Sequence, residues 1–117
     1  MPRYVILQHE TAGGVHFDLM LELGAAMRTW SLSQAPANGV EIHAKALPDH
    51  RLAYLDYEGP VSGNRGSVAR WDRGTYQIER QSDSDLVLQL DGEELKGRAS
   101  LAKKQETENE WVFLILT

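Results

Sequence analysis

The stretch that decides the fold runs from residue 15 to residue 23 and reads Val15-His16-Phe17-Asp18-Leu19-Met20-Leu21-Glu22-Leu23. Apolar residues occupy every second position, so they point to one side of an extended strand. The other side carries His16 and Asp18, two residues apart and therefore on the same face of the strand. An imidazole and a carboxylate that reach the same point in space can bind a metal or a proton. The stretch therefore predicts both a β-strand and a chemical site.

Short strand-like segments separated by turn signals make up the rest of the chain. We expect strands near residues 3–9, 15–23, 27–33, 40–46, 67–71, 75–80, 85–91, 94–101 and 110–116. Asp91-Gly92 predicts a hairpin turn, and residues 71–76 predict a second tight hairpin. Residues 48–57 predict a single helical turn.

So many short strands must cover their edges, and closure of the sheet does this in the fewest residues. We therefore predict an all-β fold, a small closed or nearly closed antiparallel β-barrel with short helical turns, in a single domain spanning residues 1–117. An open sandwich is the alternative. In a barrel, the polar face of residues 15–23 would point into a cavity or the mouth.

The composition narrows the classes of function. Hydrophobic residues at 42% and charged residues at 25% are typical of a globular protein, and the absence of cysteine excludes disulfides and thiolate zinc sites. A net charge of −5 argues against a broad nucleic-acid groove, but it leaves room for a small pocket that takes one phosphate or one strand end. No apolar stretch approaches the roughly 20 residues that cross a bilayer, and the N-terminus lacks a signal-peptide pattern. We expect a cytoplasmic monomer with no membrane segment.

A second imidazole, His9, ends the strand-like run that precedes residues 15–23 and can lie beside His16 and Asp18. Two histidines and one aspartate on neighbouring strands form a facial triad that leaves coordination positions open. This donor set suits Mn, Fe, Ni or Zn better than Mg or Ca. A histidine–aspartate hydrogen bond without a metal is the alternative, and spacing alone does not separate the two. Glu22, on the same face, is the candidate to hydrogen-bond a ligand's second nitrogen.

Two further segments contain candidate site residues. His50 and Tyr54 are four residues apart and share one face if residues 48–57 form a helical turn. Near a phosphate, His50 could donate a proton and Tyr54 could hold an oxygen, although a surface histidine beside Arg51 is the simpler interpretation. The loop around Arg65, Gly63-Asn64-Arg65-Gly66, predicts either an anion-binding loop or a simple turn.

The order of these features resembles the 3′-phosphoesterase domain of bacterial and archaeal DNA ligase D and its stand-alone relatives. The landmarks are His9, His16-Phe17-Asp18, Thr29-Trp30, Asp49-His50, Tyr54, Glu58-Gly59, Gly63-Asn64, Trp71-Asp72-Arg73-Gly74-Thr75, Glu94-Leu95-Lys96-Gly97-Arg98 and Trp111. They cover nearly the whole chain.

The resemblance implies a compact β-barrel that binds a divalent metal on His9, His16 and Asp18, usually manganese, with zinc or another transition metal as the alternative. It implies catalytic roles for His50 and Tyr54. It also implies a metal-dependent phosphoesterase that removes a terminal ribonucleoside from a DNA 3′ end and then hydrolyses the 3′-phosphate, in end-joining repair. The implied partners are DNA 3′ ends, including RNA-tipped ones, and a separate ligase or polymerase.

This chain departs from the family pattern where the family binds phosphate. Met20, Gln34 and Ile42 stand where the family has Arg, Lys and Arg, and Pro48 stands where it has Glu. Phosphate recognition would then depend on Arg28, Arg51 or Arg65. The departures motivate two alternatives: a non-catalytic or weakly active module that binds metal and nucleic-acid ends, and a phosphoesterase that acts on a smaller substrate.

Overall fold

The chain forms nine strands and one short 3-10 turn, and the computed structural model describes residues 1–116. In chain order the elements are β1 (Arg3–Thr11), β2 (Gly14–Leu23), β3 (Ala26–Leu32), β4 (Ile42–Arg51), η1 (Leu52–Leu55), β5 (Gly59–Pro60), β6 (Ser67–Ser82), β7 (Asp85–Gly92), β8 (Lys96–Lys103) and β9 (Glu110–Ile115). None of the described helical segments is long and apolar enough to cross a bilayer.

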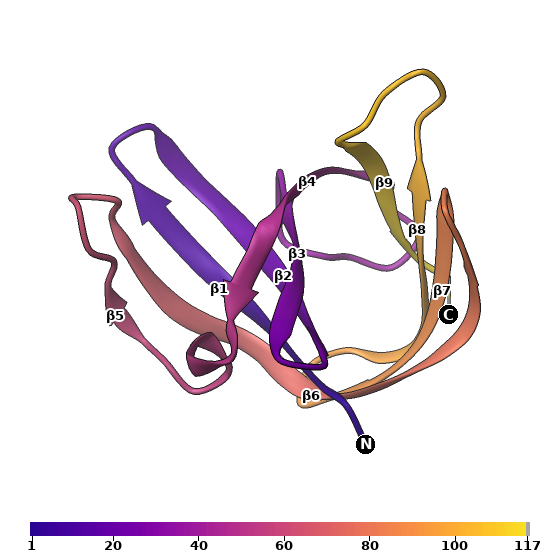
Figure 1. Cartoon of the computed structure of the whole chain (residues 1–117), viewed down its shortest axis with the longest axis horizontal. Helices are drawn as coiled ribbons and strands as arrows, with labels where there is room; N and C mark the ends of the chain where they lie inside the picture. The colour runs from indigo at the N-terminus through magenta and orange to yellow at the C-terminus, as the bar shows by residue number, and fades with distance from the viewer. Residues whose placement is uncertain (117) are drawn as a thin grey trace.

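The sheet closes on itself. The strands pair in the order β1-β2-β3-β4-β9-β8-β7-β6, and a further pairing of β1 with β6 joins the two ends of this series. All pairings between named strands are antiparallel, and β5 only extends the sheet at β6. The predicted all-β, closed or nearly closed antiparallel barrel is confirmed, and the open sandwich is not formed (Figure 1).

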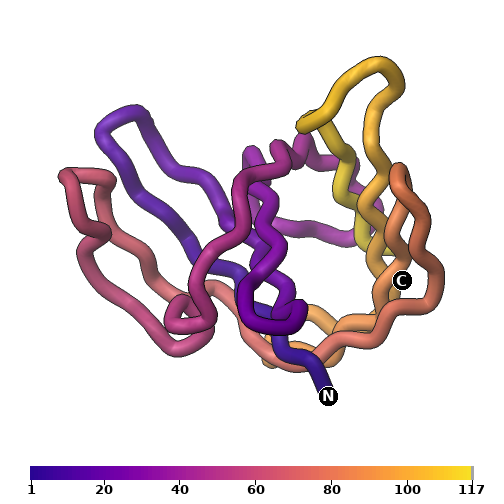
Figure 2. Tube along the Cα trace, viewed as in Figure 1, coloured from indigo at the N-terminus to yellow at the C-terminus, as the bar shows by residue number. Residues whose placement is uncertain are grey.

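Alternate residues of β1 and β2 contribute to two separate apolar clusters, one inside the ring and one outside it. Tyr4, Ile6 and Leu19 point inward, where they meet buried residues from the other ring strands. Their neighbours in sequence, Val5, Leu7 and Met20, point outward. There they form a second cluster with Met27 of β3, Val68 of β6 and Leu55 of η1. Residues 52–66, which we call the strap, cover this outer face. The trace in Figure 2 shows the strap and the β1–β2 hairpin on the same side of the ring.

Three local predictions are corrected by the structure. Residues 71–76 do not form a hairpin but run through the middle of β6. Arg70 and Asp72 pair with consecutive residues of β1, so Trp71 is the extra residue of a β-bulge. The turn predicted at Asp91-Gly92 lies at residues 93–94, where the Gly92 amide donates to the Leu95 carbonyl (2.7 Å). The helical turn is confined to η1, because β4 continues through residues 48–51.

A buried carboxylate ties β1, β6 and the β7–β8 turn together. Asp72, 1% exposed, accepts the Tyr4 hydroxyl at 2.6 Å and the backbone amides of Glu94 and Leu95 at 2.8 and 3.2 Å. A Cβ added at Gly92 would overlap both the Tyr4 hydroxyl and this carboxylate. Tyr4 points into the ring, so these contacts lie on the opposite face of β1 from the outer cluster.

Candidate metal centre

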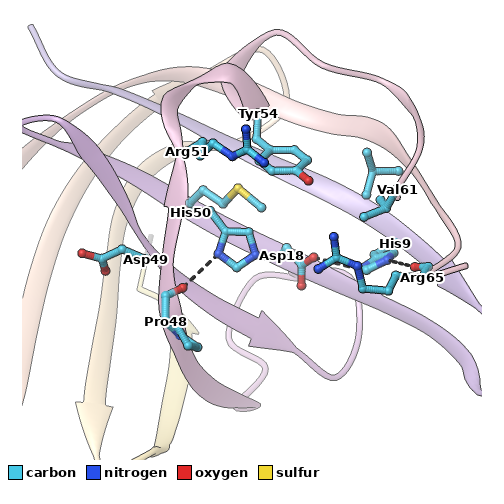
Figure 3. A pocket seen from close by; sticks show the side chains of 11 residues that line it. His9, Asp18, Pro48, Asp49, His50, Arg51, Tyr54, Val61 and Arg65 are labelled. Atoms are coloured by element: carbon cyan, nitrogen blue, oxygen red, sulfur yellow. Dashed lines mark hydrogen bonds and ion pairs between the residues drawn. The ribbon is translucent and has the colours of Figure 1, made fainter. Parts of the chain in front are cut away.

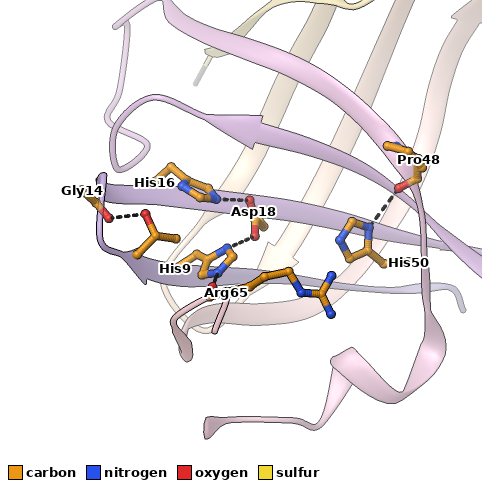
Figure 4. A network of polar contacts seen from close by, with 8 residues as sticks. His9, Gly14, His16, Asp18, Pro48, His50 and Arg65 are labelled. Atoms are coloured by element: carbon orange, nitrogen blue, oxygen red, sulfur yellow. Dashed lines mark hydrogen bonds and ion pairs between the residues drawn. The ribbon is translucent and has the colours of Figure 1, made fainter. Parts of the chain in front are cut away.

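The β1–β2 hairpin brings the three predicted metal ligands together. His9 on β1 lies directly opposite His16 on β2, and Asp18 is two residues further along the same face of β2. The two imidazole rings are 4.5 Å apart between centroids. One donor atom from each of the three residues lies within 4.8 Å of the others (Figure 4). Side-chain alternation on two antiparallel strands is sufficient to explain this convergence.

The hydrogen bonding of His9 defines which of its nitrogens is a donor. Its Nε2 lies 2.7 Å from the backbone carbonyl oxygen of Arg65, which can only accept, so Nε2 carries the proton. In the neutral ring Nδ1 is then a lone pair, and it faces the Asp18 Oδ2 at 3.1 Å. Two acceptor atoms this close repel each other unless a positive charge lies between them. That charge is either a second proton on the His9 ring or a metal ion. A carbonyl that fixes the tautomer of a histidine is a common support of metal ligands.

The second oxygen of Asp18 distinguishes the two alternatives. Oδ1 is buried and lies 3.2 Å from His16 Nε2, yet the geometry of that contact is not a hydrogen bond and no donor reaches this oxygen among the described residues. An unsatisfied buried acceptor is unfavourable by about 1–3 kcal/mol. Burial raises the pKa of the Asp18 carboxyl above its ordinary value, against the opposing effect of His16 and His9. Two imidazole nitrogens and a buried carboxylate without a full set of hydrogen-bond donors are ligands that fit a divalent transition metal.

The other predicted catalytic residues line the same cavity, of about 390 Å³. His50 Nδ1 donates to the Pro48 carbonyl at 2.9 Å, which leaves Nε2 free to face the cavity. The His50 and Tyr54 rings contact each other with centroids 5.8 Å apart. Arg51 and Arg65 line this cavity as well, so six of the eight predicted site residues surround it (Figure 3). A seventh, His16, contacts His9 and Asp18.

The remaining predicted residue, Arg28, lies elsewhere. Its guanidinium stacks over the rings of Trp30 and Trp111, 4.7 and 5.4 Å from their centroids. Because Trp30 and Trp111 belong to the cluster inside the ring, Arg28 is on the opposite side of the sheet from the cavity. It does not line the cavity, and we do not assign it a phosphate-binding role.

Two further expectations about the site's surroundings are corrected. The polar face of β2 does not point into the barrel or its mouth; it points outward, where the strap forms the opposite wall of the cavity. Glu22 does not support a ligand histidine, because its carboxylate accepts the Arg3 amide at 2.8 Å. The second nitrogen of His9 is instead hydrogen-bonded to the backbone carbonyl of Arg65 in the strap. The only sequence signal for it is the predicted turn at residues 63–66, in which Asn64 adopts φ 56°.

The four positions that depart from the family pattern lie in different environments. Met20, 1% exposed, forms part of the cavity wall, and Pro48 lines the cavity and accepts from His50. Ile42 is buried inside the ring, and Gln34 is exposed in the connection after β3. Of these four positions, Met20 and Pro48 line the cavity, and neither side chain carries a charge.

Comparison with known proteins identifies relatives of this chain. The family model for the DNA ligase D 3′-phosphoesterase domain matches residues 8–103. The multifunctional non-homologous end joining protein LigD of Pseudomonas aeruginosa is 32% identical over 111 residues, which cover 86% of this chain and 13% of that protein. The multifunctional non-homologous end joining DNA repair protein LigD of Mycobacterium tuberculosis is 26% identical over 107 residues, which cover 84% of this chain and 14% of that protein. The chain thus spans about one seventh of the length of these relatives.

Proposed function

Because this chain belongs to the DNA ligase D 3′-phosphoesterase domain family, we propose that it is a metal-dependent phosphoesterase acting on the 3′ ends of DNA in end-joining repair. The proposed reactions are removal of a 3′-terminal ribonucleoside and hydrolysis of the resulting 3′-phosphate. The names of its relatives, which are end-joining proteins, support the pathway. A DNA 3′ end is the proposed partner, with a ligase or polymerase acting on the same end.

The proposal is carried by the convergence of His9, His16 and Asp18 and by the buried Asp18 Oδ1, which no donor among residues 1–116 reaches. These three residues would hold the ion, manganese in the first instance and zinc as the alternative. When bound, the ion would supply Lewis-acid stabilisation of the charge that develops on a phosphoryl oxygen. The Arg65 carbonyl keeps His9 in the tautomer whose free nitrogen faces Asp18.

His50 and Tyr54 act on the substrate from the opposite wall of the cavity. The bond from His50 Nδ1 to Pro48 orients the ring and directs Nε2 toward the space in front of Asp18. In its imidazolium form, which carries a proton on Nε2 as well, His50 is placed to give that proton to a leaving oxygen. Tyr54 packs edge-on against His50 and can donate its hydroxyl to a phosphate oxygen. Both residues come from the segment where β4 runs into η1, so one rigid turn positions them together.

An end-trimming assay tests this function. The protein is incubated with manganese and a DNA strand that ends in a 3′-phosphate or in one 3′ ribonucleotide. We expect release of inorganic phosphate or of a nucleoside, and loss of both in His16→Ala. His43→Ala is the matched control, because His43 lies on β4 beside Glu110 and away from the cavity. Turnover that persists in His16→Ala would refute the metal centre.

Met20 favours a second candidate function, a module that binds metal and strand ends without turnover. An arginine at this position could give a charge-assisted pair of hydrogen bonds to phosphate, and a methionine cannot. Elemental analysis separates the two candidates when it is combined with the assay. Stoichiometric metal without phosphate release supports the module, whereas metal with release supports the enzyme.

A further inference from the structure

Two arginines at the cavity are without acidic partners in a chain that has an excess of acidic residues. Among residues 1–116, five arginines form ion pairs with carboxylates: Arg3, Arg70, Arg73, Arg80 and Arg98. Arg51 and Arg65 form no such pair within the described part of the chain, and both line the cavity beside the metal ligands. Since the chain has 17 acidic residues for 12 basic ones, two unneutralised guanidinium groups on one cavity indicate a site for an anion.

The two guanidinium groups reach the cavity from different walls. Arg51 ends β4 and lies beside Tyr54, whereas Arg65 comes from the strap and lies beside His9 and Asp18 (Figure 3). Arg65 is held in place, because its Nε donates to the Ser62 carbonyl at 2.7 Å and its Nη2 to the Ser62 hydroxyl at 3.1 Å. Asp49 also lines the cavity, but in Figure 3 it lies on the other side of His50 from Arg65. The two guanidinium groups are therefore in different parts of the cavity, and that of Arg65 adjoins the proposed metal ligands.

Apolar side chains line the same cavity as these two arginines. Met20, Val61 and Val68 line the cavity, and none of them can bind an anion. A ligand that fits this pattern has two anionic groups joined by a less polar unit. Consecutive phosphates of a single nucleic-acid strand, joined by a sugar that carries a base, have this chemistry.

We infer that Arg65 and Arg51 bind two successive phosphates of a polynucleotide 3′ end and so replace the cation that is missing at Met20. Arg65, beside the metal ligands, binds the terminal phosphate, and Arg51 binds the next phosphate upstream. The inference rests on the proposed function for the kind of strand end, and it adds a preference: the site discriminates a strand from a single nucleotide through Arg51.

The test compares binding of two probes, a single-stranded oligonucleotide with a 3′-phosphate and thymidine 3′-monophosphate. Dissociation constants are measured in chelator, where no turnover occurs, over a series of salt concentrations. The variants are Arg51→Gln, Arg65→Gln and Arg65→Lys, with Arg80→Gln as the matched control because Arg80 pairs with Asp85 far from the cavity. Thermal unfolding of each variant verifies that the fold is intact.

We expect Arg65→Gln to weaken both probes about tenfold or more, and Arg51→Gln to weaken the oligonucleotide alone. For the oligonucleotide, Arg51→Gln and Arg65→Gln should each reduce the slope of log affinity against log salt by about 0.7, the value for one phosphate contact of a single strand. Arg65→Lys should retain the slope of the unaltered protein, because it retains the charge.

Three results would overturn the inference. The first is binding by Arg51→Gln and Arg65→Gln that equals the Arg80→Gln control. The second is an equal loss for both probes in Arg51→Gln, and the third is an unaltered protein that binds neither probe. A protein that binds through both arginines but releases no phosphate with manganese would refute the proposed phosphoesterase function and leave this inference standing.

Discussion

Replacing Asp18 by asparagine should have opposite effects on stability without and with metal. Without metal, Asp18 Oδ1 has no donor, and Oδ2 faces the His9 Nδ1 lone pair at 3.1 Å. An asparagine amide can donate to that nitrogen and removes a buried negative charge. The amide nitrogen satisfies the His9 Nδ1 acceptor, while the amide oxygen stays at the position of Oδ1, so the penalty relieved is that of one unsatisfied buried acceptor, about 1–3 kcal/mol. At roughly 4 °C per kcal/mol for a domain of this length, Asp18→Asn should raise Tm by about 4–12 °C in chelator.

Manganese should reverse this order. An ion present at one thousand times its Kd stabilises the folded state by about 4.1 kcal/mol, which corresponds to roughly 16 °C in Tm for the unaltered protein. The Asp18→Asn variant lacks the carboxylate ligand, so manganese should raise its Tm very little.

Thermal unfolding followed by tryptophan fluorescence, in chelator and in manganese at pH 8, measures both effects. Asp49→Asn is the control, because Asp49 lines the same cavity outside the ligand set. If Asp18→Asn proves less stable than the unaltered protein in chelator, or gains as much from manganese, our interpretation of the centre is wrong.

Three other perturbations test the supports of the site and the fold. Gly66→Ala should weaken manganese binding about 10–100-fold in a metal titration. Gly66 adopts φ +86°, and an added Cβ would overlap the backbone of β1 and displace the Arg65 carbonyl from His9. Gly92→Ala should lower the urea midpoint of unfolding, because its Cβ overlaps the bond between Tyr4 and Asp72; an unchanged midpoint would show that this contact is dispensable. Burial, aided by Asp72, raises the pKa of the Tyr4 hydroxyl in the folded state. The protonated hydroxyl therefore stabilises the fold fully below its ordinary pKa near 10, and this stabilisation is lost as the pH rises above that value. The free energy of unfolding should fall by about 1.4 kcal/mol per pH unit above pH 10, and Tyr4→Phe should reduce that slope.

Under the proposed function, the cations that bind phosphate come from outside β2, which contributes Asp18 and Met20 to the cavity. The wall of the cavity at Met20 is apolar, while guanidinium groups come from the end of β4 and from the strap. If Arg65 binds phosphate as we infer, the strap would couple substrate binding to the geometry of the proposed metal ligands, because the Arg65 carbonyl also supports His9.

The sequence alone determined which residues share a face. The alternation in residues 15–23 predicted β2 and a shared face for His16 and Asp18, and the strand-like run ending at His9 predicted that this imidazole can lie beside them. The register of β1 and β2 places His9 opposite His16. These are local consequences of a two-residue period, which holds wherever the strand lies in the fold. The closed sheet followed from the number of short strands and the need to cover their edges.

Only the tertiary structure decided which face of β2 is inside the barrel and what covers the other. Both faces are buried, since Leu19 packs inside the ring and Met20 packs under the strap, so hydrophobicity could not distinguish them. The contact between His9 and the carbonyl of Arg65 joins residues 56 apart in the chain. Such contacts depend on the path of the whole backbone, because a carbonyl has no side-chain signature that a local pattern could reveal.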